Sequence, residues 1–148
     1  MRNTCRIVIA DDHPLVRRIV RRILESVNNF RVVGEAGDGE EAVEQVGEQH
    51  PDAAILDLAM PKLNGIEATR RIRQLPSPPE VIVLTAYQDD YFVFQAFDAG
   101  CIGYVTKESA PTDLPDAINE VVQGRFFLSR SVRHLSREIE RRQGISKE

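Results

Sequence analysis

Several features that would assign the protein to a specialised class are absent from its sequence. No apolar run approaches the roughly eighteen residues of a membrane-spanning helix, and the opening MRNTCRIVIADD lacks the pattern of a signal peptide. The two cysteines lack metal-ligand spacing, and the three histidines suggest neither a metal site nor a nucleophile pair. The net charge of −4 argues against a basic nucleic-acid binder. We therefore expect a cytoplasmic protein with reduced cysteines and no membrane partner.

The apolar residues that are present fall into two alternating kinds of segment. Runs rich in valine and isoleucine indicate parallel strands buried on both faces, at 5–10, 31–36, 53–58, 80–86 and 103–107. Between them, helical spacing of apolar residues predicts helices over 14–27, 39–49, 65–74, 89–99 and 112–123. The 148 residues suit one ordinary domain. This alternation predicts an α/β fold with a doubly wound, parallel (βα)₅ sheet.

Two segments carry less certain patterns. In PLVRRIVRRILESV an apolar stripe that includes Leu15 and Ile19 lies opposite four arginines, which are most simply a solvated face and alternatively a site for an acidic partner. After residue 124 a thin stripe of Val132, Leu135 and Ile139 runs among many charges. We expect a sixth, partly exposed helix or linker there.

Polar residues follow the ends of four predicted strands. Asp11 and Asp12 follow the first strand, Asp57 ends the third, Thr85 ends the fourth and Lys107 ends the fifth. Because the functional crevice of an open α/β sheet lies at the carboxyl ends of its strands, we expect these five side chains to converge.

The expected cluster has a chemical interpretation. Three crowded carboxylates repel one another, and a divalent cation such as Mg²⁺ would offset that repulsion. Asp57 would then act as a carboxylate nucleophile that accepts a phosphoryl group, with Lys107 and Thr85 contacting the phosphoryl oxygens. Alone, Asp57 would more simply be a helix N-cap or a surface carboxylate. The presence of the other four residues favours the functional interpretation.

Five segments together resemble a known family. IADDHPLVR, GEAGDGEEAV, ILDLAMPKLNGIEATRRIR, VIVLTAY and AGCIGYVTKES are similar to the receiver domains of two-component response regulators, over residues 5 to about 128. The likeness is closest to NarL-type regulators, whose receivers precede a helix-turn-helix DNA-binding domain of the LuxR class. The resemblance implies a flavodoxin-like fold with strand order 2-1-3-4-5, and a signalling domain rather than an enzyme. Pro61 and Gly65 match the family's loop after the acceptor strand.

The resemblance also implies roles for individual residues. Asp57 would be phosphorylated by a sensor histidine kinase. Mg²⁺, with Mn²⁺ as a substitute, would be held by Asp12, Asp57 and the backbone carbonyl of Ala59, with Asp11 acting through water. Lys107 would pair with the phosphoryl group or with Asp57.

Further roles concern signal transmission and its duration. Thr85 and Tyr104 would be the switch pair, with Tyr104 moving inward after phosphorylation; the plainer alternative is a core tyrosine whose hydroxyl meets water. Ala59 and Tyr87 occupy positions that tune the lifetime of the phosphoryl group in receivers. Ala59 has no polar side chain to position a water and Tyr87 is bulky enough to cover the site, so we expect slow autodephosphorylation.

Alternative functions and the domain organisation remain open at this stage. A phosphatase of the haloacid-dehalogenase type needs a second acid where Ala59 stands, which argues against that class. A stand-alone receiver that acts as a docking module, with or without phosphate, is the other alternative. We expect a receiver over residues 1–128 and a linker helix over 129–148, which would lead to an output domain outside this chain that binds DNA. A homodimer would form through helix 4, strand 5 and helix 5, or through helices 1 and 5.

Overall fold

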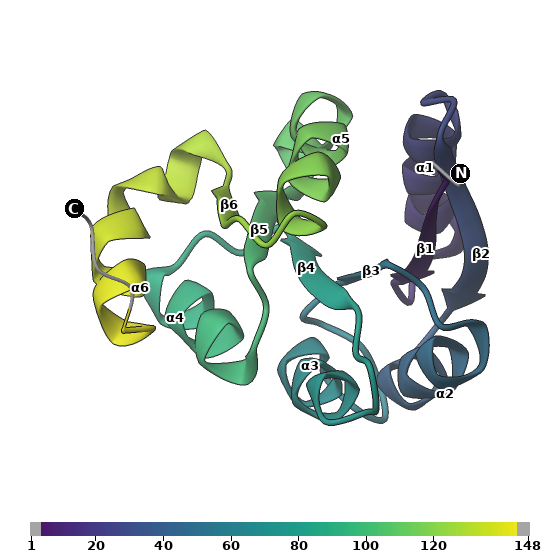
Figure 1. Ribbon diagram of the computed structural model, residues 1–148, viewed down its shortest axis with the longest axis horizontal. Helices are drawn as coiled ribbons and strands as arrows, with labels where there is room; N and C mark the ends of the chain where they lie inside the picture. Colours follow the sequence, from purple (N-terminus) through teal and green to yellow (C-terminus); the bar gives the residue numbers. More distant parts are fainter. Residues whose placement is uncertain (1–3, 145–148) are drawn as a thin grey trace.

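A parallel sheet of six strands runs through the middle of the protein, in the order β2-β1-β3-β4-β5-β6 (Figure 1). The computed structural model describes residues 4–144. The strands are β1 (Cys5–Ala10), β2 (Phe30–Ala36), β3 (Ala53–Leu56), β4 (Glu80–Thr85), β5 (Gly103–Thr106) and β6 (Phe127–Leu128). The helices are α1 (Pro14–Glu25), α2 (Gly39–Gln49), α3 (Gly65–Arg73), α4 (Asp90–Ala99), α5 (Ala110–Val121) and α6 (Ser136–Arg142), with short 3₁₀ segments η1 (Lys107–Ser109) and η2 (Arg130–Leu135).

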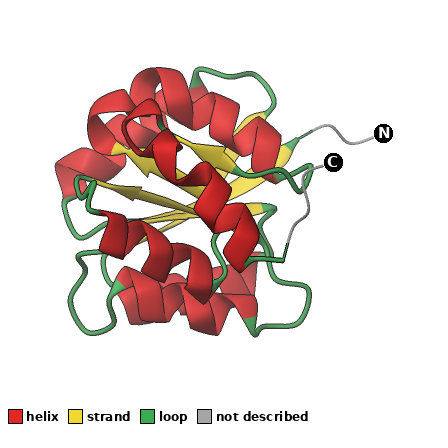
Figure 2. Cartoon of the chain, turned by 90° about the vertical axis from the view of Figure 1, so that its left-hand side faces the viewer, coloured by secondary structure: helices red, strands yellow, loops and turns green. Residues whose placement is uncertain are grey.

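Helices cover both faces of the sheet (Figure 2). Successive side chains of a strand point to opposite faces, so each strand contributes side chains to two cores, one on each face of the sheet. In β1, Ile7 and Ile9 pack in the core under α1 and α5, whereas Val8 and Ala10 pack in the core under α2, α3 and α4. The predicted doubly wound α/β fold and its strand order 2-1-3-4-5 are confirmed.

The sheet has one strand more than the five that the sequence predicts. Gly124 has a φ of +82°, which turns the chain after α5 and sends it back along β5. Two residues then pair in parallel with Gly103 and Tyr104 to form β6. A strand of two residues is too short to show a periodic pattern, so it could not be predicted.

The segment of residues 126–142, here called the C-terminal arm, packs against α4 (Figure 1). Val132, Leu135 and Ile139 are buried, as their predicted apolar stripe suggests, and they join the core of α4. The guanidinium of Arg142 lies 4.0 Å from the centre of the Phe94 ring. The arm therefore belongs physically to the folded unit. The expected division into residues 1–128 and 129–148 stays a prediction, and its outer ends, 1–3 and 145–148, lie outside the described residues.

Helix α1 departs from its predicted pattern on both sides. Leu15 and Ile19 belong to the apolar stripe, yet their exposed fractions are 64% and 51%. Arg17 and Arg21 were expected to face solvent, but both form ion pairs with Glu35 of β2. The apolar stripe is wider than the strip of sheet beneath the helix, which leaves an apolar surface uncovered. Within residues 4–144, no helix is both long and apolar enough to cross a membrane.

Candidate functional site

Adjacent strands bring the predicted acids together at one edge of the sheet. Ala10 of β1 pairs with Leu56 of β3, and the next residue of each strand is an aspartate. The backbone N–H of Asp57 donates to the carbonyl of Ala10 over 3.0 Å, which extends this pairing to the acid itself. Asp11 and Asp57 are only 3% and 4% exposed. The strands thus place two buried carboxylates side by side.

Lys107 supplies the positive charge between these acids. It follows β5, whose Thr106 pairs with Thr85 of β4, so it emerges at the same edge. Its Nζ lies 2.9 Å from Oδ2 of Asp11 and 3.0 Å from Oδ2 of Asp57. Burial alone would lower the pKa of Lys107, but the hydrogen bonds to the two carboxylates outweigh this effect and the pKa is raised. Lys107 therefore stays an ammonium at neutral pH.

The carboxyl group of Asp57 has a raised pKa. The main cause is burial, which disfavours the charged form, and the neighbouring charge of Asp11 acts in the same direction. Hydrogen bonds from Lys107 and from the backbone N–H of Leu58 oppose the shift without cancelling it. A carboxylate that is short of stabilising partners retains more of its basicity, which favours reaction as a nucleophile.

The remaining acid, Asp12, completes a possible cation site. Asp11, Asp12, His13 and Asp57 each offer one ligand atom, and these atoms all lie within 4.8 Å of one another. Oδ1 of Asp12 is shielded from solvent and accepts no hydrogen bond from residues 4–144. With Lys107 included, the three carboxylates still leave two uncompensated negative charges. Carboxylate oxygens and this charge suit a hard divalent cation, so the residues fit Mg²⁺.

The loop after β3 is shaped by the close approach of α3. The N–H of Gly65 donates to the carbonyl of Leu58 over 2.9 Å. A Cβ atom at Gly65 would lie 2.1 Å from the carbonyl oxygen of Asp57, so no residue with a side chain fits there. Asn64 caps α3 by accepting from the N–H of Glu67. The glycine therefore lets the loop fold tightly behind the acceptor acid.

Thr85 and Tyr104 lie close to the acids but do not bond to them. Both side chains are buried, at 1% and 0% exposure. The Thr85 hydroxyl accepts from the N–H of Tyr87 at 3.4 Å, and the Tyr104 hydroxyl donates to the carbonyl of Tyr87 at 2.9 Å. Tyr104 is thus a core residue, as the plainer alternative has it, but its hydroxyl bonds to the backbone instead of meeting water; its switch role stays a prediction. Both residues contact the backbone of the loop between β4 and α4.

Ala59 and Tyr87 line one depression beside the cluster. Its volume is about 400 Å³, and Tyr91 and Phe92 of α4 line it as well. Ala59 is exposed, and the Tyr87 ring stacks on Phe92 with 4.9 Å between ring centres. Two positions far apart in the sequence therefore line one depression, and their expected role in the lifetime of the phosphoryl group stays a prediction.

Sequence reasoning missed two contributors to this edge. His13, which was set aside for lack of a pattern, has its Nδ1 3.1 Å from Oδ1 of Asp11; its place directly after the acidic pair was the available signal. Arg17 donates to the backbone carbonyl of Asp11, a contact that sequence spacing does not reveal. Cys101 is an inert core residue, since complete burial raises the pKa of its thiol.

Comparison with known proteins identifies the family. Residues 7–119 match the model of the response regulator receiver domain. This chain belongs to that family. A receiver is a signalling domain, so the expected class of protein is confirmed at that level.

Named relatives agree with this assignment. The receiver is 40% identical over 132 residues to the transcriptional regulatory protein DegU of Brevibacillus brevis, covering 89% of this chain and 56% of DegU. A crystal structure of a LuxR-family two-component response regulator from Aurantimonas sp. matches with a TM-score of 0.84 and 40% identity, over 95% of this chain and 99% of that one. The response regulator RcsB, in a complex with DNA, matches with a TM-score of 0.82 and 34% identity, over 95% of this chain and 71% of RcsB. The chain thus spans little more than half the length of DegU.

Proposed function

We propose that this receiver accepts a phosphoryl group on Asp57 from a phosphohistidine of a sensor histidine kinase. The observation that carries the proposal is the position of Asp57, a buried carboxylate that Lys107 holds beside Asp11 at the edge of the sheet. Asp12, Asp57 and the carbonyl of Ala59 would hold Mg²⁺ or Mn²⁺, with Asp11 acting through water. When bound, the cation offsets the negative charge of the carboxylates and of the phosphoryl oxygens.

The transfer can be written for the residues of this chain. A carboxylate oxygen of Asp57 forms a bond to phosphorus as the bond from phosphorus to the kinase imidazole breaks, and the imidazole leaves with the electron pair. Oδ2 of Asp57 is bound to Lys107, which orients the carboxylate for this attack. Lys107 then turns its ammonium to the new phosphoryl oxygens while keeping Asp11 as a partner.

The response follows from the two buried hydroxyl residues. The Thr85 hydroxyl would leave the N–H of Tyr87 to donate to a phosphoryl oxygen, because a charged acceptor forms the stronger bond. Tyr104 holds the carbonyl of the same Tyr87, so the loop would change position with it. Helix α4 follows this loop directly. A charge change at Asp57 thereby shifts the population between two packings of α4.

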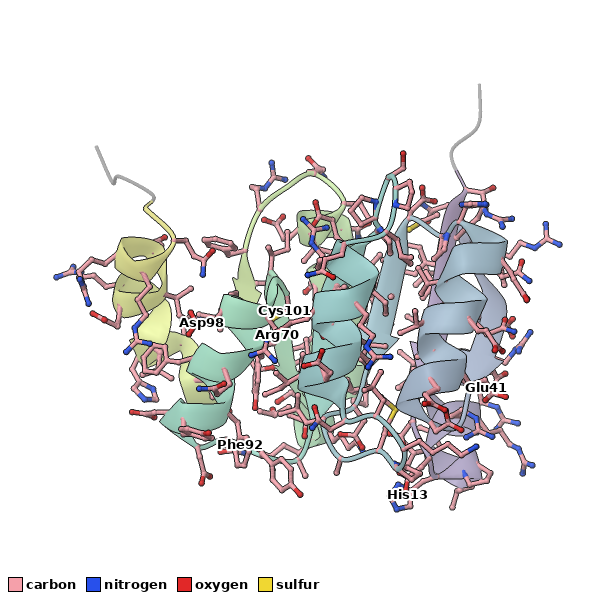
Figure 3. All side chains as sticks on the ribbon, turned by 90° about the horizontal axis from the view of Figure 1, so that it is seen from below. His13, Glu41, Arg70, Phe92, Asp98 and Cys101 are labelled. Atoms are coloured by element: carbon pink, nitrogen blue, oxygen red, sulfur yellow. The ribbon has the colours of Figure 1, made fainter. Side chains whose placement is uncertain are left out.

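Phosphorylation tests this proposal directly. The protein is incubated with Mg²⁺ and acetyl phosphate, and its intact mass is measured against an Asp57→Ala variant. We expect the wild type to gain one phosphoryl group, and this gain to disappear in Asp57→Ala or when EDTA is present. Asp98→Ala, which removes an exposed aspartate of α4 (Figure 3), is the matched control and should be phosphorylated like the wild type. Equal labelling of Asp57→Ala would overturn the proposal.

The output is proposed by analogy with relatives. DegU is named as a transcriptional regulator and RcsB is described with DNA. We propose that the receiver, acting in the cytoplasm, controls a DNA-binding domain that the arm joins to it, and that this chain alone does not bind DNA. Electrophoretic mobility of promoter DNA with and without an attached output domain tests this point. A phosphatase of the haloacid-dehalogenase type is disfavoured because exposed Ala59 offers no acid.

Of the two expected dimer surfaces, we propose that the homodimer forms through α1 and α5. The arm occupies the other surface, since β6 pairs with β5 and the arm packs on α4. Beside α1 and α5, Ile19 and Pro111 line an apolar depression of about 240 Å³ next to Lys107. We expect Ile19→Glu to abolish the homodimer of the phosphorylated receiver in sedimentation experiments. Gly47→Glu, which adds the same charge at an exposed position of α2 with open space around it, serves as the control and should still dimerise.

A further inference from the structure

His13 lies beside the acidic cluster, and its side chain does not cap the helix that follows it. It occupies the N-cap position of α1, but its side chain makes no capping hydrogen bond. The side chain is 64% exposed. Figure 3 shows His13 at the same end of the molecule as Phe92, which lies in the first turn of α4. This is the end at which the acids gather.

The imidazole faces two of the carboxylates. Its Nδ1 lies 3.1 Å from Oδ1 of Asp11 and 3.0 Å from Oδ1 of Asp12. The backbone N–H of His13 donates to the same oxygen of Asp11 over 2.9 Å, which fixes the backbone from which the ring extends. Despite the short distance, Oδ1 of Asp12 accepts no hydrogen bond within residues 4–144, so its lone pairs remain available. Nδ1 is thus within reach of any cation bound by these acids.

We propose that His13 is a further ligand of the metal site, through Nδ1, and that it raises the affinity of the site for first-row transition ions relative to Mg²⁺. This inference rests on the proposed metal site and adds a nitrogen to its oxygen ligands. Mg²⁺ takes oxygen ligands, whereas Ni²⁺ and Zn²⁺ accept imidazole readily. The four ligand atoms already lie within 4.8 Å of one another, so one ion contacts all of them after small side-chain movements. A neutral imidazole with its proton on Nε2 presents the required lone pair.

The chain offers a matched pair of histidines for the test. His134 has nearly the same exposure as His13, 62%, but lies beside Asp90 of α4. Glutamine retains a polar side chain of similar size and lacks the imidazole. Ni²⁺ and Mg²⁺ affinities are measured by titration calorimetry at one fixed pH, for the untagged wild type, His13→Gln and His134→Gln. We expect His13→Gln to weaken Ni²⁺ binding about tenfold or more and to change Mg²⁺ binding much less. His134→Gln should match the wild type with both ions.

A spectroscopic measurement decides whether the nitrogen touches the metal. With Mn²⁺ bound, pulsed electron paramagnetic resonance detects the magnetic coupling of a coordinated imidazole nitrogen. We expect this coupling in the wild type and its loss in His13→Gln. Absence of the coupling in a wild type that binds Mn²⁺, or equal Ni²⁺ affinity in His13→Gln, would show that His13 only donates a hydrogen bond and would overturn the inference. Phosphorylation of Asp57 with Mg²⁺ is scored separately, so the proposed function survives or fails on its own result.

Discussion

Replacing Lys107 with methionine removes the ammonium that lies between two buried carboxylates. In the wild type its Nζ is 2.9 Å from Asp11 and 3.0 Å from Asp57. In Lys107→Met these two acids, each under 5% exposed, face one another with no positive charge between them. We therefore expect the folded state of the variant to be destabilised when divalent cations are absent.

The size of the loss follows from the distances. At about 3 Å and an effective dielectric constant of about 20, each ion pair is worth about 5.5 kcal/mol of Coulomb energy. The net loss is smaller than the sum of the two Coulomb energies for two reasons. Burying methionine carries no cost of desolvating an ammonium, and the Lys107 side chain is still 25% exposed to solvent. Removing one partner of a buried pair costs about 3–5 kcal/mol. We expect about 3 kcal/mol, which lowers Tm by about 10 °C for a chain of this length.

Urea unfolding followed by circular dichroism in EDTA measures this loss. Lys62→Met is the matched control, because Lys62 is 64% exposed and lies 3.6 Å from Asp38; its loss should stay below about 1 kcal/mol. A double-mutant cycle with Asp57→Asn then isolates the pair formed by Lys107 and Asp57. If Lys107→Met unfolds at the same urea concentration as Lys62→Met, the electrostatic account of the site is wrong.

Three further predictions concern the same edge of the sheet. The pKa of Asp57 is raised, mainly by burial, so its ionised form destabilises the fold. Asp57→Asn should therefore raise the urea midpoint at neutral pH in EDTA. The difference in midpoint between Asp57→Asn and the wild type should shrink as the pH falls through the pKa of Asp57, because the wild-type carboxyl then becomes neutral. Tyr104→Phe removes the hydrogen bond to the carbonyl of Tyr87 and should lower the free energy of unfolding in urea by about 1 kcal/mol. An unchanged free energy of unfolding would show that this bond does not stabilise the fold. Ala59→Asn and Tyr87→Ala should each shorten the lifetime of the phosphorylated protein after the phosphodonor is removed, and an unchanged decay rate in both would contradict slow autodephosphorylation.

The main strands and helices could be predicted because their apolar residues follow strong periodic patterns. The predicted strand over 80–86 became β4, and the predicted helix over 39–49 became α2. The convergence of Asp11, Asp57 and Lys107 was predictable as well, since parallel strands end at a common edge. Strand β3 stops at Leu56, two residues earlier than predicted, because the chain leaves the ladder after the hydrogen bond from the N–H of Asp57 to Ala10.

Other features depend on packing that no local pattern encodes. Sequence periodicity assigned Leu15 and Ile19 to the apolar stripe of α1, but it does not reveal how much of that stripe the sheet covers, and both are exposed. Arg17 was assigned to solvent because its partner Glu35 lies on another element. The position of Tyr104, whose hydroxyl contacts a backbone carbonyl of a distant loop, depends on the same long-range packing. Residues such as these could be assigned only from the folded chain.

The added strand changes what the β5 side of the sheet can do. The N–H of Phe127 donates to Ile102, that of Ser129 donates to Tyr104, and the Ser129 hydroxyl accepts from Thr106. The backbone groups that β5 would otherwise present to solvent are therefore already engaged, and a foreign strand cannot pair with β5 itself. The strand that carries Tyr104 is also hydrogen-bonded on both flanks. Movement of Tyr104 must then come from rotation of its side chain, over a backbone that stays in register.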